Sequence, residues 1–509
     1  MSVITRSSTV DGIIRRSART FRDRPATIFG GRTLTYAALD EAVTRAAAHL
    51  LGLGLAKGDR VAAYGKNSDA YLIGFLACAR AGLVHVPLNY NLTGPELSYL
   101  VTQSGSRAIL HDPALAGHLD LLDPEALELL ERRIPLRDAD GSLVDVALSG
   151  EVPEVEVEVA DTDTAQFLYT SGTTSRPKAA IMSHRALVHE YLSCIVALDL
   201  AADDNPLHVM PLYHSAQMHV FLVPWLAVGA TNTILEVPDA AEILRRIEED
   251  GHRSFFAAPT LWVAMANHAD FEDRDLDGLR KAYYGASIMP VPVLQRIQAK
   301  APSLGFYNCF GQSEIAPLAT VLRPEEHADR PDSAGRPVLF VEARVVDAEG
   351  NDVAAGETGE IVYRSPQLCD GYWDDPGATA EAFSGGWFHS GDLVRIDEEG
   401  YVFVVDRIKD VINTGGVLVA SREVEDALYT HPAVAEVAVV GEPDEKWVEA
   451  VTAFVVPKSE VTEADLIAHV RDRLASFKLP KRVTFVESLP RNASGKILKR
   501  ELRRDAEAS

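Results

Sequence analysis

A run of hydroxyl side chains with one glycine and one lysine, Tyr169–Lys178, lies between two short apolar segments. Phe167–Tyr169 precedes the centre of the run and Ala179–Met182 follows it, and both segments are typical of β-strands. The run is not the glycine-rich loop that opens a helix, because the Walker spacing is absent. Hydroxyls and consecutive backbone N–H groups can surround an oxyanion, and an ammonium group neutralises it. The sequence therefore predicts a strand–loop–strand cradle for phosphate. Its candidate residues are Thr170, Ser171, Gly172, Thr173, Thr174 and Lys178.

Size and charge limit what the rest of the chain can be. A chain of 509 residues is too long for one hydrophobic core, so two or more domains are expected. The net charge of −25 argues against nucleic acid and anionic lipid as partners, so local groups of cations must capture anionic ligands. No apolar run approaches the length of a membrane span, and the first residues show no secretory signal. Four scattered cysteines fit a reducing compartment, and we expect a cytoplasmic protein.

Helix-like and strand-like segments alternate in the first part of the chain. Apolar residues of Leu39–Leu50 fall on one helical face, and Arg60–Tyr64 is typical of a short buried strand. Tyr71–Leu76 predicts a second helix and His85–Leu88 a second strand. This alternation indicates an α/β architecture with parallel strands. Pro153–Asp163, where Val and Glu alternate, is either an exposed strand or a connector.

The composition changes toward the C-terminus. Gly, Asp and Val dominate residues from about 330 to 405 and turns are frequent, which indicates a β-rich subdomain. A smaller α+β unit follows. Its predicted strands are Val437–Val440 and Val451–Val456, and its predicted helix covers Glu463–Ala475.

Seven segments of the chain resemble motifs of the adenylate-forming (ANL) superfamily and occur in the same order as in that superfamily. The superfamily contains acyl-CoA synthetases, peptide-synthetase adenylation domains and luciferases. The hydroxyl-rich cradle resembles the signature of that superfamily, and six further segments resemble its later motifs. They span nearly the whole chain, and their order makes a chance agreement negligible. The segments are Tyr169–Lys178, Pro211–His214, Tyr284–Ser287, Asn308–Glu314, Trp387–Asp392, Asp406–Asp410 and Pro490–Lys496.

The resemblance implies a fold of the mixed α/β and α+β class. Residues 1–408 would form a large N-terminal domain of two αβ sheets plus a β-barrel-like subdomain at about 330–405. Residues 410–509 would form a small, mobile α+β domain, and the hinge would lie at Lys409. Domain boundaries of this kind fall between separately packed cores.

The same resemblance implies an acid–CoA ligase that uses ATP, Mg²⁺ and coenzyme A. A carboxylate attacks the α-phosphate of ATP to give an acyl-adenylate and pyrophosphate, and a thiol then displaces AMP. Both steps build negative charge on oxygen atoms, so cations and donors matter more than a protein nucleophile. By resemblance, Lys496 bridges the carboxylate and the α-phosphate, Glu314 binds Mg²⁺, and Lys409 is the pivot between the two steps.

The remaining implied contacts are to the nucleotide and to the thiol. Asp392 would accept from the ribose hydroxyls, with Arg407 beside it, and Gly415 and Gly416 would border the pantetheine arm of coenzyme A. The implied nucleotide-binding residues are the cradle residues given above together with Tyr284, Gly285, Ala286, Ser287, Asn308, Phe310, Gly311, Gln312, Ser313, Asp392 and Arg407.

Several of these residues have an ordinary alternative. Asp392 after a glycine is also typical of a turn, and Arg407 could form an ion pair with Asp406 or Asp410. Phe310 and Tyr284 could stack on adenine or could be core aromatics. In the same way, Lys496 could be a surface lysine, Glu314 a solvated carboxylate, and the pair of glycines a flexible turn.

His214 bears on the kind of acid. It lies where amino-acid-activating relatives place an aspartate, and it supplies no permanent negative charge. The ammonium of an α-amino acid would be left unpaired there, which is costly, so a plain carboxylic acid is favoured. The candidate acyl pocket is mostly apolar or small, although such residues could also be plain core. Its candidate residues are Ala216, Met218, Val220, Gly285, Ile288 and Cys309.

Some positions depart from the superfamily pattern. Ser175 and Ala179 replace two glycines of the cradle, and Cβ atoms restrict a phosphate-binding backbone. Gly416–Arg422 lacks the usual polar residue and proline, and Val448 stands where glycine is common. Two interpretations follow. Either the protein is a complete ligase, or it has impaired adenylation and performs mainly the thioester step on an adenylate made elsewhere.

Other functions stay open at this level. A ligase that loads an acyl-carrier protein in trans is a close rival, and a luciferase would need an unusual substrate. A non-catalytic ligand-binding homologue is disfavoured because it would not need the retained charged residues. The identity of the acid, the choice between monomer and homodimer, and the pathway cannot be read from the residues.

Overall fold

The computed structural model describes residues 8–170, 176–285, 289, 291–444, 446–491 and 497–507. The chain divides into two compact units. The first comprises Met1–Glu342 and Arg364–Phe388, and the second comprises Ala343–Tyr363 and His389–Ser509. Residues 343–363 and 389–408, which the sequence assigned to the N-terminal domain, thus group with the C-terminal residues. The hinge at Lys409 stays a prediction.

The first unit contains a six-stranded sheet with the order β6-β5-β3-β4-β7-β8. Its strands run parallel except for β8, which pairs with β7 in the opposite direction. The strands are β3 (Arg60–Tyr64), β4 (Val84–Leu88), β5 (Ser106–His111), β6 (Arg132–Pro135), β7 (Thr164–Thr170) and β8 (Lys178–Ser183). The parallel arrangement predicted from the sequence is confirmed for this region.

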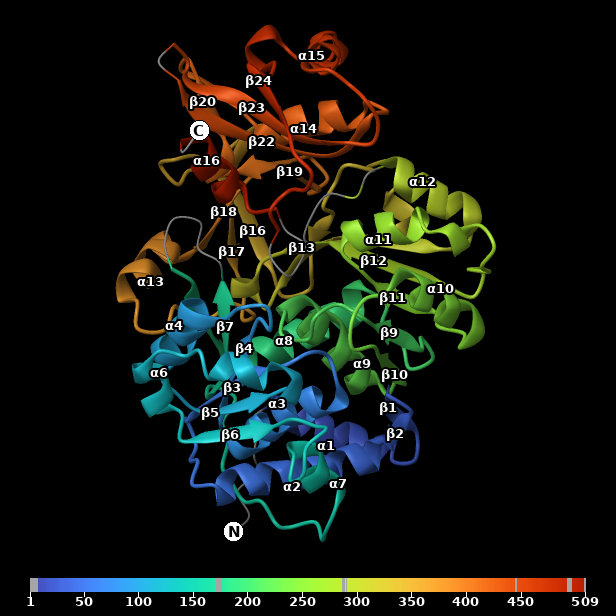
Figure 1. Cartoon of the computed structure of the whole chain (residues 1–509), viewed down its shortest axis with the longest axis vertical. Helices are drawn as coiled ribbons and strands as arrows, with labels where there is room; N and C mark the ends of the chain where they lie inside the picture. The colour runs from blue at the N-terminus through green and yellow to red at the C-terminus, as the bar shows by residue number, and fades with distance from the viewer. Residues whose placement is uncertain are drawn as a thin grey trace. The chain divides into compact units, whose positions relative to one another are not determined.

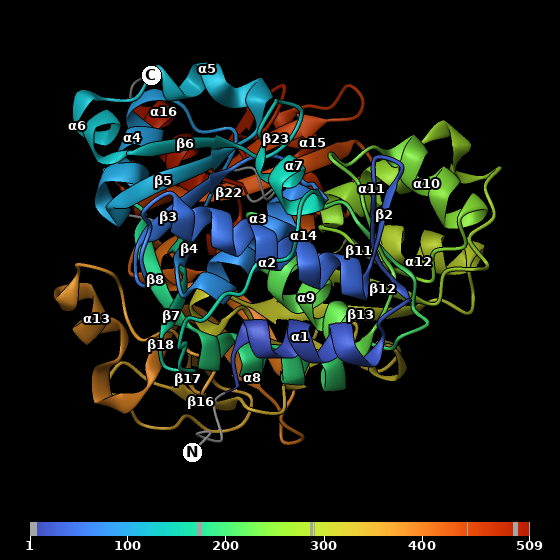
Figure 2. The same ribbon diagram turned by 90° about the horizontal axis from the view of Figure 1, so that it is seen from below.

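Alternate residues of β3 enter two different cores, as the period of a strand requires. Val61 and Ala63 pack in the cluster of α2 (Tyr36–Gly52) and α3 (Asp69–Ala81), whereas Ala62 and Tyr64 pack in the cluster of α4 (Gly94–Ser104) and α6 (Pro124–Leu129). Helices therefore cover both faces of this sheet, as Figure 2 shows. The short helices α5 (Ala116–Leu119) and α7 (Leu143–Leu148) complete these layers.

A nine-stranded sheet forms the other half of the first unit, with the order β15-β14-β13-β12-β11-β9-β10-β1-β2. Its centre is parallel, and β2, β14 and β15 pair antiparallel at its ends. Helices α10 (Ala240–Glu249), α11 (Pro259–Ala266) and α12 (Val291–Lys300) pack on it, visible in green and yellow in Figure 1. The strands are β1 (Pro25–Phe29), β2 (Arg32–Thr35), β9 (Pro206–His208), β10 (Asn232–Ile234), β11 (Ser254–Phe256), β12 (Lys281–Gly285), β13 (Gly305–Gly311), β14 (Leu318–Leu322) and β15 (Arg336–Pro337).

One continuous apolar cluster contains side chains from the helices that pack against the two sheets of the first unit. It contains side chains of α1 (Val10–Thr20), α8 (His184–Ala197) and α9 (Val223–Val228) as well as α2 and α3. The π-helix η2 (Ala216–Leu222) contributes Met218 and Leu222 to the same cluster. A π-helix is a rare element that recurs at functional sites. The short helix α13 (Pro376–Ala382) also belongs to this unit.

The second unit contains two smaller sheets. One has the order β16-β17-β18-β19, with β16 (Glu342–Val346), β17 (Thr358–Arg364), β18 (Phe388–Ile396) and β19 (Val402–Arg407). The other has β20 (Ile412–Thr414), β21 (Val417–Val419), β22 (Val434–Asp444), β23 (Val448–Pro457) and β24 (Arg482–Phe485). Helices α14 (Ser421–Tyr429), α15 (Glu463–Arg471) and α16 (Lys499–Glu507) accompany the second sheet, whose core is rich in valine.

Most of the predicted elements are confirmed. The predicted strand Arg60–Tyr64 is β3, and the predicted C-terminal strands lie within β22 and β23. The segment 153–163 has no regular structure, and its residues are half-buried or exposed, so it is the connector rather than the strand. The predicted helix from Glu463 ends at Arg471, four residues earlier than expected. None of the helices in the described residues combines the length and the apolar character that a membrane span requires.

Candidate functional site

The cradle has the strand–loop–strand form that the sequence predicts. Strands β7 and β8 pair antiparallel, and Thr170 faces Lys178 as the last pair before the loop. Ser171, Gly172, Thr173 and Thr174, with Ser175, lie outside the described residues. Ala179 is buried and pairs with Tyr169, so its methyl group fits within an ordinary strand.

Tyr372 connects the cradle lysine to the candidate metal ligand. The Lys178 ammonium lies 5.4 Å from the centre of the Tyr372 ring and 3.9 Å from an Asp375 carboxylate oxygen. The Tyr372 hydroxyl donates to Glu314 Oε1 at 3.1 Å. Burial, followed by the Glu314 carboxylate, raises the pKa of Tyr372, so the phenol stays protonated and can donate. Tyr372 could not be identified from the sequence, because no motif contains it and only the fold brings it to Glu314.

Glu314 is suited to a hard cation. The residue is 8% exposed, lies in the short 3₁₀ helix Ser313–Ile315, and its backbone carbonyl accepts from Cys369 N–H at 2.8 Å. Carboxylate oxygen is the ligand that Mg²⁺ prefers, and Mg²⁺ usually takes only one or two protein carboxylates. Among the described residues there is no group of three or more metal-binding side chains, so any Mg²⁺ here would use few protein ligands.

The ends of β12 and β13 form a tight pair beside this carboxylate. Gly285 pairs with Cys309, and a Cβ atom on Gly285 would lie 2.3 Å from the Cys309 carbonyl oxygen, so glycine is required there. Phe310 is half-buried on β13, and the Asn308 amide donates to the Ser333 carbonyl at 3.0 Å. Ala286, Ser287 and Ile288 lie outside the described residues.

Tyr284 is a core aromatic. Its ring packs in the apolar cluster of the nine-stranded sheet, and the residue is only 3% exposed. Its hydroxyl lies 3.1 Å from His327 Nε2. A ring held this way does not face a ligand, which favours the core alternative for Tyr284. Of the two aromatics considered for adenine, Phe310 is the more accessible.

The segment from Gly311 to Ser313 brings two predicted motifs together. A Cβ atom on Gly311 would lie 2.0 Å from the Pro317 carbonyl oxygen, so the chain passes too closely for any side chain. Ser313 Oγ lies 3.2 Å from Ser215 Oγ, next to His214. Within the described residues, the buried Gln312 Nε2 has no hydrogen-bond partner, so this amide is available to a ligand.

The candidate acyl-pocket residues separate into two groups. Ala216 and Cys309 are half-buried, and Ala216 N–H donates to His214 Nδ1 at 3.3 Å. Met218 and Val220 are 1% and 2% exposed, and Met218 belongs to the central apolar cluster. Met218 and Val220 are therefore core residues, which is the alternative that the sequence left open for all the apolar candidates.

In the second unit, the two residues predicted to bind ribose form an ion pair with each other. Asp392 on β18 and Arg407 on β19 are register partners, with Arg407 Nε 2.6 Å from Asp392 Oδ1. The expected alternative, an ion pair of Arg407 with Asp406 or Asp410, is not what the structure shows. Asp406 instead accepts from the backbone N–H and hydroxyl of Ser421.

The predicted pivot and the following glycine turn also lie in this unit. Lys409 is in the short 3₁₀ helix Ile408–Asp410. Gly415 and Gly416 have φ of 66° and 85°, so both residues of the β20–β21 turn adopt the left-handed backbone conformation that favours glycine. Val448, one of the positions that departs from the superfamily pattern, also has a positive φ, 67°. A branched side chain rarely adopts this conformation, so the backbone is strained at Val448. Lys496 lies outside the described residues.

A half-buried lysine, Lys499, follows the Lys496 segment and was not among the residues predicted from the sequence. Lys499 Nζ lies 2.7 Å from Glu425 Oε1 and donates to Ser421 Oγ at 2.6 Å. Burial by itself lowers the pKa of Lys499, but the neighbouring carboxylates, led by that of Glu425, together outweigh burial and raise this pKa. The start of α16 is thereby tied to α14. Lys499 lies three residues after Lys496 and belongs to none of the motifs, so nothing in the sequence singled it out.

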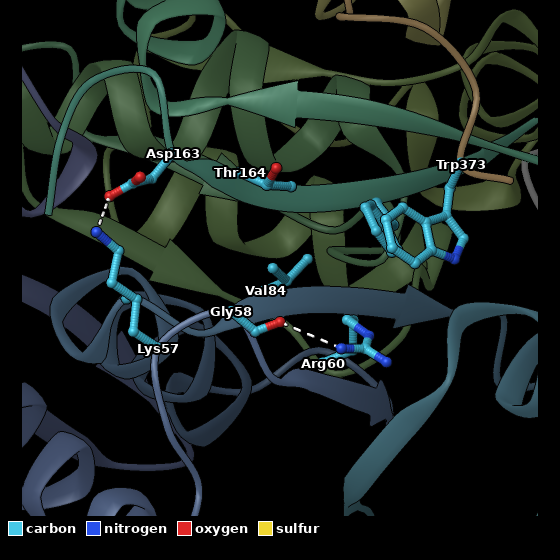
Figure 3. Close-up of a pocket in the computed structure, with 9 residues that line it drawn as sticks. Lys57, Gly58, Arg60, Val84, Asp163, Thr164 and Trp373 are labelled. Carbon is cyan, nitrogen blue, oxygen red and sulfur yellow. Dashed lines mark hydrogen bonds and ion pairs between the residues drawn. The ribbon is translucent and has the colours of Figure 1, made fainter. Parts of the chain in front are cut away.

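A cleft of about 250 Å³ in the first unit is a different feature (Figure 3). It lies at the amino ends of β3, β4 and β7, marked by Arg60, Val84 and Thr164. Its charges are already paired, because Lys57 binds Asp163 at 2.6 Å and Arg60 donates to backbone carbonyls. Ligands of α/β sheets bind at the carboxyl ends of the strands, so this cleft is not the candidate active site.

Comparison with known proteins agrees with this geometry. The sequence model described as AMP-binding enzyme matches residues 14–373, and that of the AMP-binding enzyme C-terminal domain matches residues 423–496. Feruloyl-CoA synthase of Amycolatopsis sp is 38% identical over 96% of this chain and 97% of its own length. The fatty acid–[acyl-carrier-protein] ligase ScoC of Streptomyces coeruleorubidus is 36% identical over 94% and 93%.

Solved structures show the same fold. The ATP-bound structure of MatB from Rhodopseudomonas palustris superposes with a TM-score of 0.90 at 30% identity, over 98% of this chain and 99% of that one. The mixed α/β architecture predicted from the sequence is therefore confirmed. The chain belongs to the AMP-binding enzyme family and is an acid–thiol ligase of its acyl-CoA synthetase branch.

Proposed function

We propose that the protein converts a largely apolar carboxylic acid without an α-amino group to its acyl-adenylate and then to its coenzyme A thioester. The observation that carries the proposal is the 3.2 Å contact between Ser215 and Ser313. It joins the segment of His214, proposed to meet the acid, to the segment of Glu314, proposed to hold Mg²⁺ with ATP. An enzyme that holds both reactants side by side makes their reaction effectively unimolecular, and this proximity lowers the activation free energy.

The proposed roles in the first unit follow from the contacts. Lys178, with the cradle, meets ATP phosphates, and Glu314 offers carboxylate oxygen to Mg²⁺, which would neutralise phosphate charge. Tyr372 holds Glu314 through its hydroxyl at 3.1 Å. Gln312 and Phe310 serve the nucleotide base. His214 places no carboxylate beside the acid, in keeping with a substrate that has no ammonium group.

In the second unit, we assign Asp392 to the ribose hydroxyls, oriented by Arg407 at 2.6 Å. Lys409 is the pivot, and Gly415 and Gly416 meet the thiol arm. Lys496 is assigned to the carboxylate and the α-phosphate by its motif alone.

The experiment measures the two half-reactions separately. Purified protein, ATP and Mg²⁺ are mixed with hydroxycinnamic, fatty and indole acids, and pyrophosphate release is followed without coenzyme A. Mass detection of the thioester then follows addition of coenzyme A. A thioester-only enzyme would make product from a synthetic adenylate but release no pyrophosphate. The buried, unstrained Ala179 favours the complete ligase.

A second candidate is the loading of an acyl-carrier protein. The resemblance to the ligase ScoC, at 36% identity over 94% of this chain, supports it. Replacing coenzyme A by a carrier protein with its phosphopantetheine arm separates the two. Faster acyl transfer to the carrier than to coenzyme A would favour the second candidate.

A further inference from the structure

Two buried amide side chains hold the segment that leads to His214. They are Asn67, in the loop after β3, and Gln217, on the π-helix, and they are 2% and 1% exposed. Neither belongs to the proposed contacts with acid, nucleotide or metal. Both bond the backbone of Val209–Leu212, immediately before the proposed acid-binding residues.

Asn67 reaches from the six-stranded sheet to the carboxyl ends of β9 and β10. Its Nδ2 donates to the carbonyls of Val209, Met210 and Leu235 at 3.3, 3.0 and 3.1 Å. Its Oδ1 accepts from Leu212 N–H at 2.7 Å. Every polar atom of this amide is used, so a buried polar side chain is fully satisfied at the junction of two sheets.

Gln217 holds the same segment from the other direction. Its Oε1 accepts from Met210 N–H at 3.1 Å, and its Nε2 donates to His208 Nδ1 at 2.8 Å. Burial lowers the pKa of His208 to about 4, so the imidazole is neutral. Its Nε2–H can then donate to Asn232 Oδ1 at 2.9 Å. Gln217 is thus oriented by a chain of bonds that ends on β10.

The π-helix is fixed to the six-stranded sheet as well. His219, two residues after Gln217, lies 2.7 Å from Gln166 Oε1 on β7. Gln166 Nε2 in turn lies 2.9 Å from His85 Nδ1 on β4. These bonds do not involve residues 209–212, whereas Gln217 bonds Met210 directly, so the two buried side chains of this helix have separate tasks.

We propose that Asn67 and Gln217 are positioning residues that set where His214 and Ser215 stand relative to Ser313. They act through the backbone of residues 209–212 and touch no substrate. Loss of either amide moves the acid-binding segment and leaves the cradle and Glu314 in place. The inference rests on the proposed function, because it takes the His214 segment as the place of the acid.

The test compares Gln217→Met, Gln217→Glu and a matched control, His219→Gln. Gln217→Met removes both hydrogen bonds at similar volume, whereas Gln217→Glu keeps an acceptor for Met210 N–H. His219→Gln changes an equally buried side chain of the same helix that does not bond residues 209–212. Steady-state KM is measured for the acid and for ATP, together with relative kcat/KM across acids of different length.

We expect Gln217→Met to raise KM for the acid roughly tenfold and to change the order of preferred acids, with KM for ATP within about twofold. Gln217→Glu should restore much of the acid KM, and Asn67→Leu carries the test if the methionine variant does not fold. His219→Gln should lower the urea midpoint without changing either KM. For Asn67→Leu we expect the same selective effect on the acid.

Three outcomes contradict the inference. The first is a Gln217→Met enzyme, or an Asn67→Leu enzyme if the methionine variant does not fold, with a lower urea midpoint and an unchanged acid KM and preference. The second is an equal rise in KM for acid and for ATP. The third is wild-type protein that releases no pyrophosphate with any acid, which removes the proposed function and this inference together. An active wild type with the first or second outcome removes the inference alone.

Discussion

Asp392 and Arg407 face each other across β18 and β19, with the guanidinium 2.6 Å from the carboxylate. Their side chains are 5% and 28% exposed, so the pair is mostly removed from water. Asp392→Asn keeps the size of the side chain but leaves Arg407 without this anion. We expect a loss of about 1–3 kcal/mol in the free energy of unfolding, measured by urea denaturation. KM for ATP should rise in parallel, and an unchanged KM would remove Asp392 from the nucleotide site.

Replacing Val448 by glycine should stabilise the protein. A non-glycine residue at positive φ destabilises the folded state by on the order of 1–3 kcal/mol. Glycine removes this strain, but its larger entropy in the unfolded chain offsets about half of the gain. We expect Val448→Gly to raise the free energy of unfolding by about 1 kcal/mol in urea titrations.

Val417→Gly is the matched control for this change. Val417 is also an exposed valine of a strand in the second unit, but its φ is not positive. Glycine there should destabilise by roughly 0.5–1 kcal/mol. Equal effects of the two substitutions would show that the backbone at Val448 is not strained.

Glu314→Gln tests the metal role. Glutamine can still accept from the Tyr372 hydroxyl, so the local packing is kept while the negative charge is lost. We expect pyrophosphate release to fall by roughly 100-fold, with a large rise in the Mg²⁺ concentration needed for half-maximal rate. Tyr372→Phe keeps the ring beside Lys178 and loses only the bond to Glu314, so its effect should be smaller. If the Mg²⁺ dependence of Glu314→Gln matched wild type, the metal would bind elsewhere.

The pair of Lys499 and Glu425 should show strong coupling. Their side chains are 16% and 11% exposed, so removing one partner leaves a charge with little solvent around it. Lys499→Met should cost about 3–5 kcal/mol of unfolding free energy. Adding Glu425→Gln should recover part of that loss, since glutamine can still accept from Val439 N–H. Additive losses in this double-mutant cycle would contradict a direct interaction.

Buried histidines should make the protein sensitive to mild acid. Burial lowers the pKa of His85 and of His219 to about 3, below the unfolded value of 6.5. Their contribution to stability is complete above pH 6.5 and is lost as the pH falls toward 3, because the unfolded chain takes up the protons. At pH 5 each accounts for roughly 2 kcal/mol of lost unfolding free energy. Urea titrations from pH 7 to 5 measure this slope, and His219→Gln should reduce it. An unchanged slope would show that His219 does not contribute.

Local pattern predicted much of the fold. The period of Leu39–Leu50 and the apolar run Arg60–Tyr64 lead directly to α2 and β3, since each depends on residues that are neighbours in sequence. The end of α15 was missed by four residues, because helix ends depend on caps and on packing beyond the helix. Tyr284 could not be assigned to the core or to a ligand until the position of His327 was known.

The family, the strand–loop–strand form of the cradle and the residues able to supply charge and hydroxyls can all be recognised from the sequence, because each is a property of residue type and order. Three contacts become known only from the fold: Tyr372 with Glu314, Asn67 with the backbone before His214, and Arg407 with Asp392. The partners in the first two contacts are 58 and 145 positions apart in the chain. A side chain's hydrogen-bond partner depends on which backbones pack together in space, and no local spacing in the sequence carries that information.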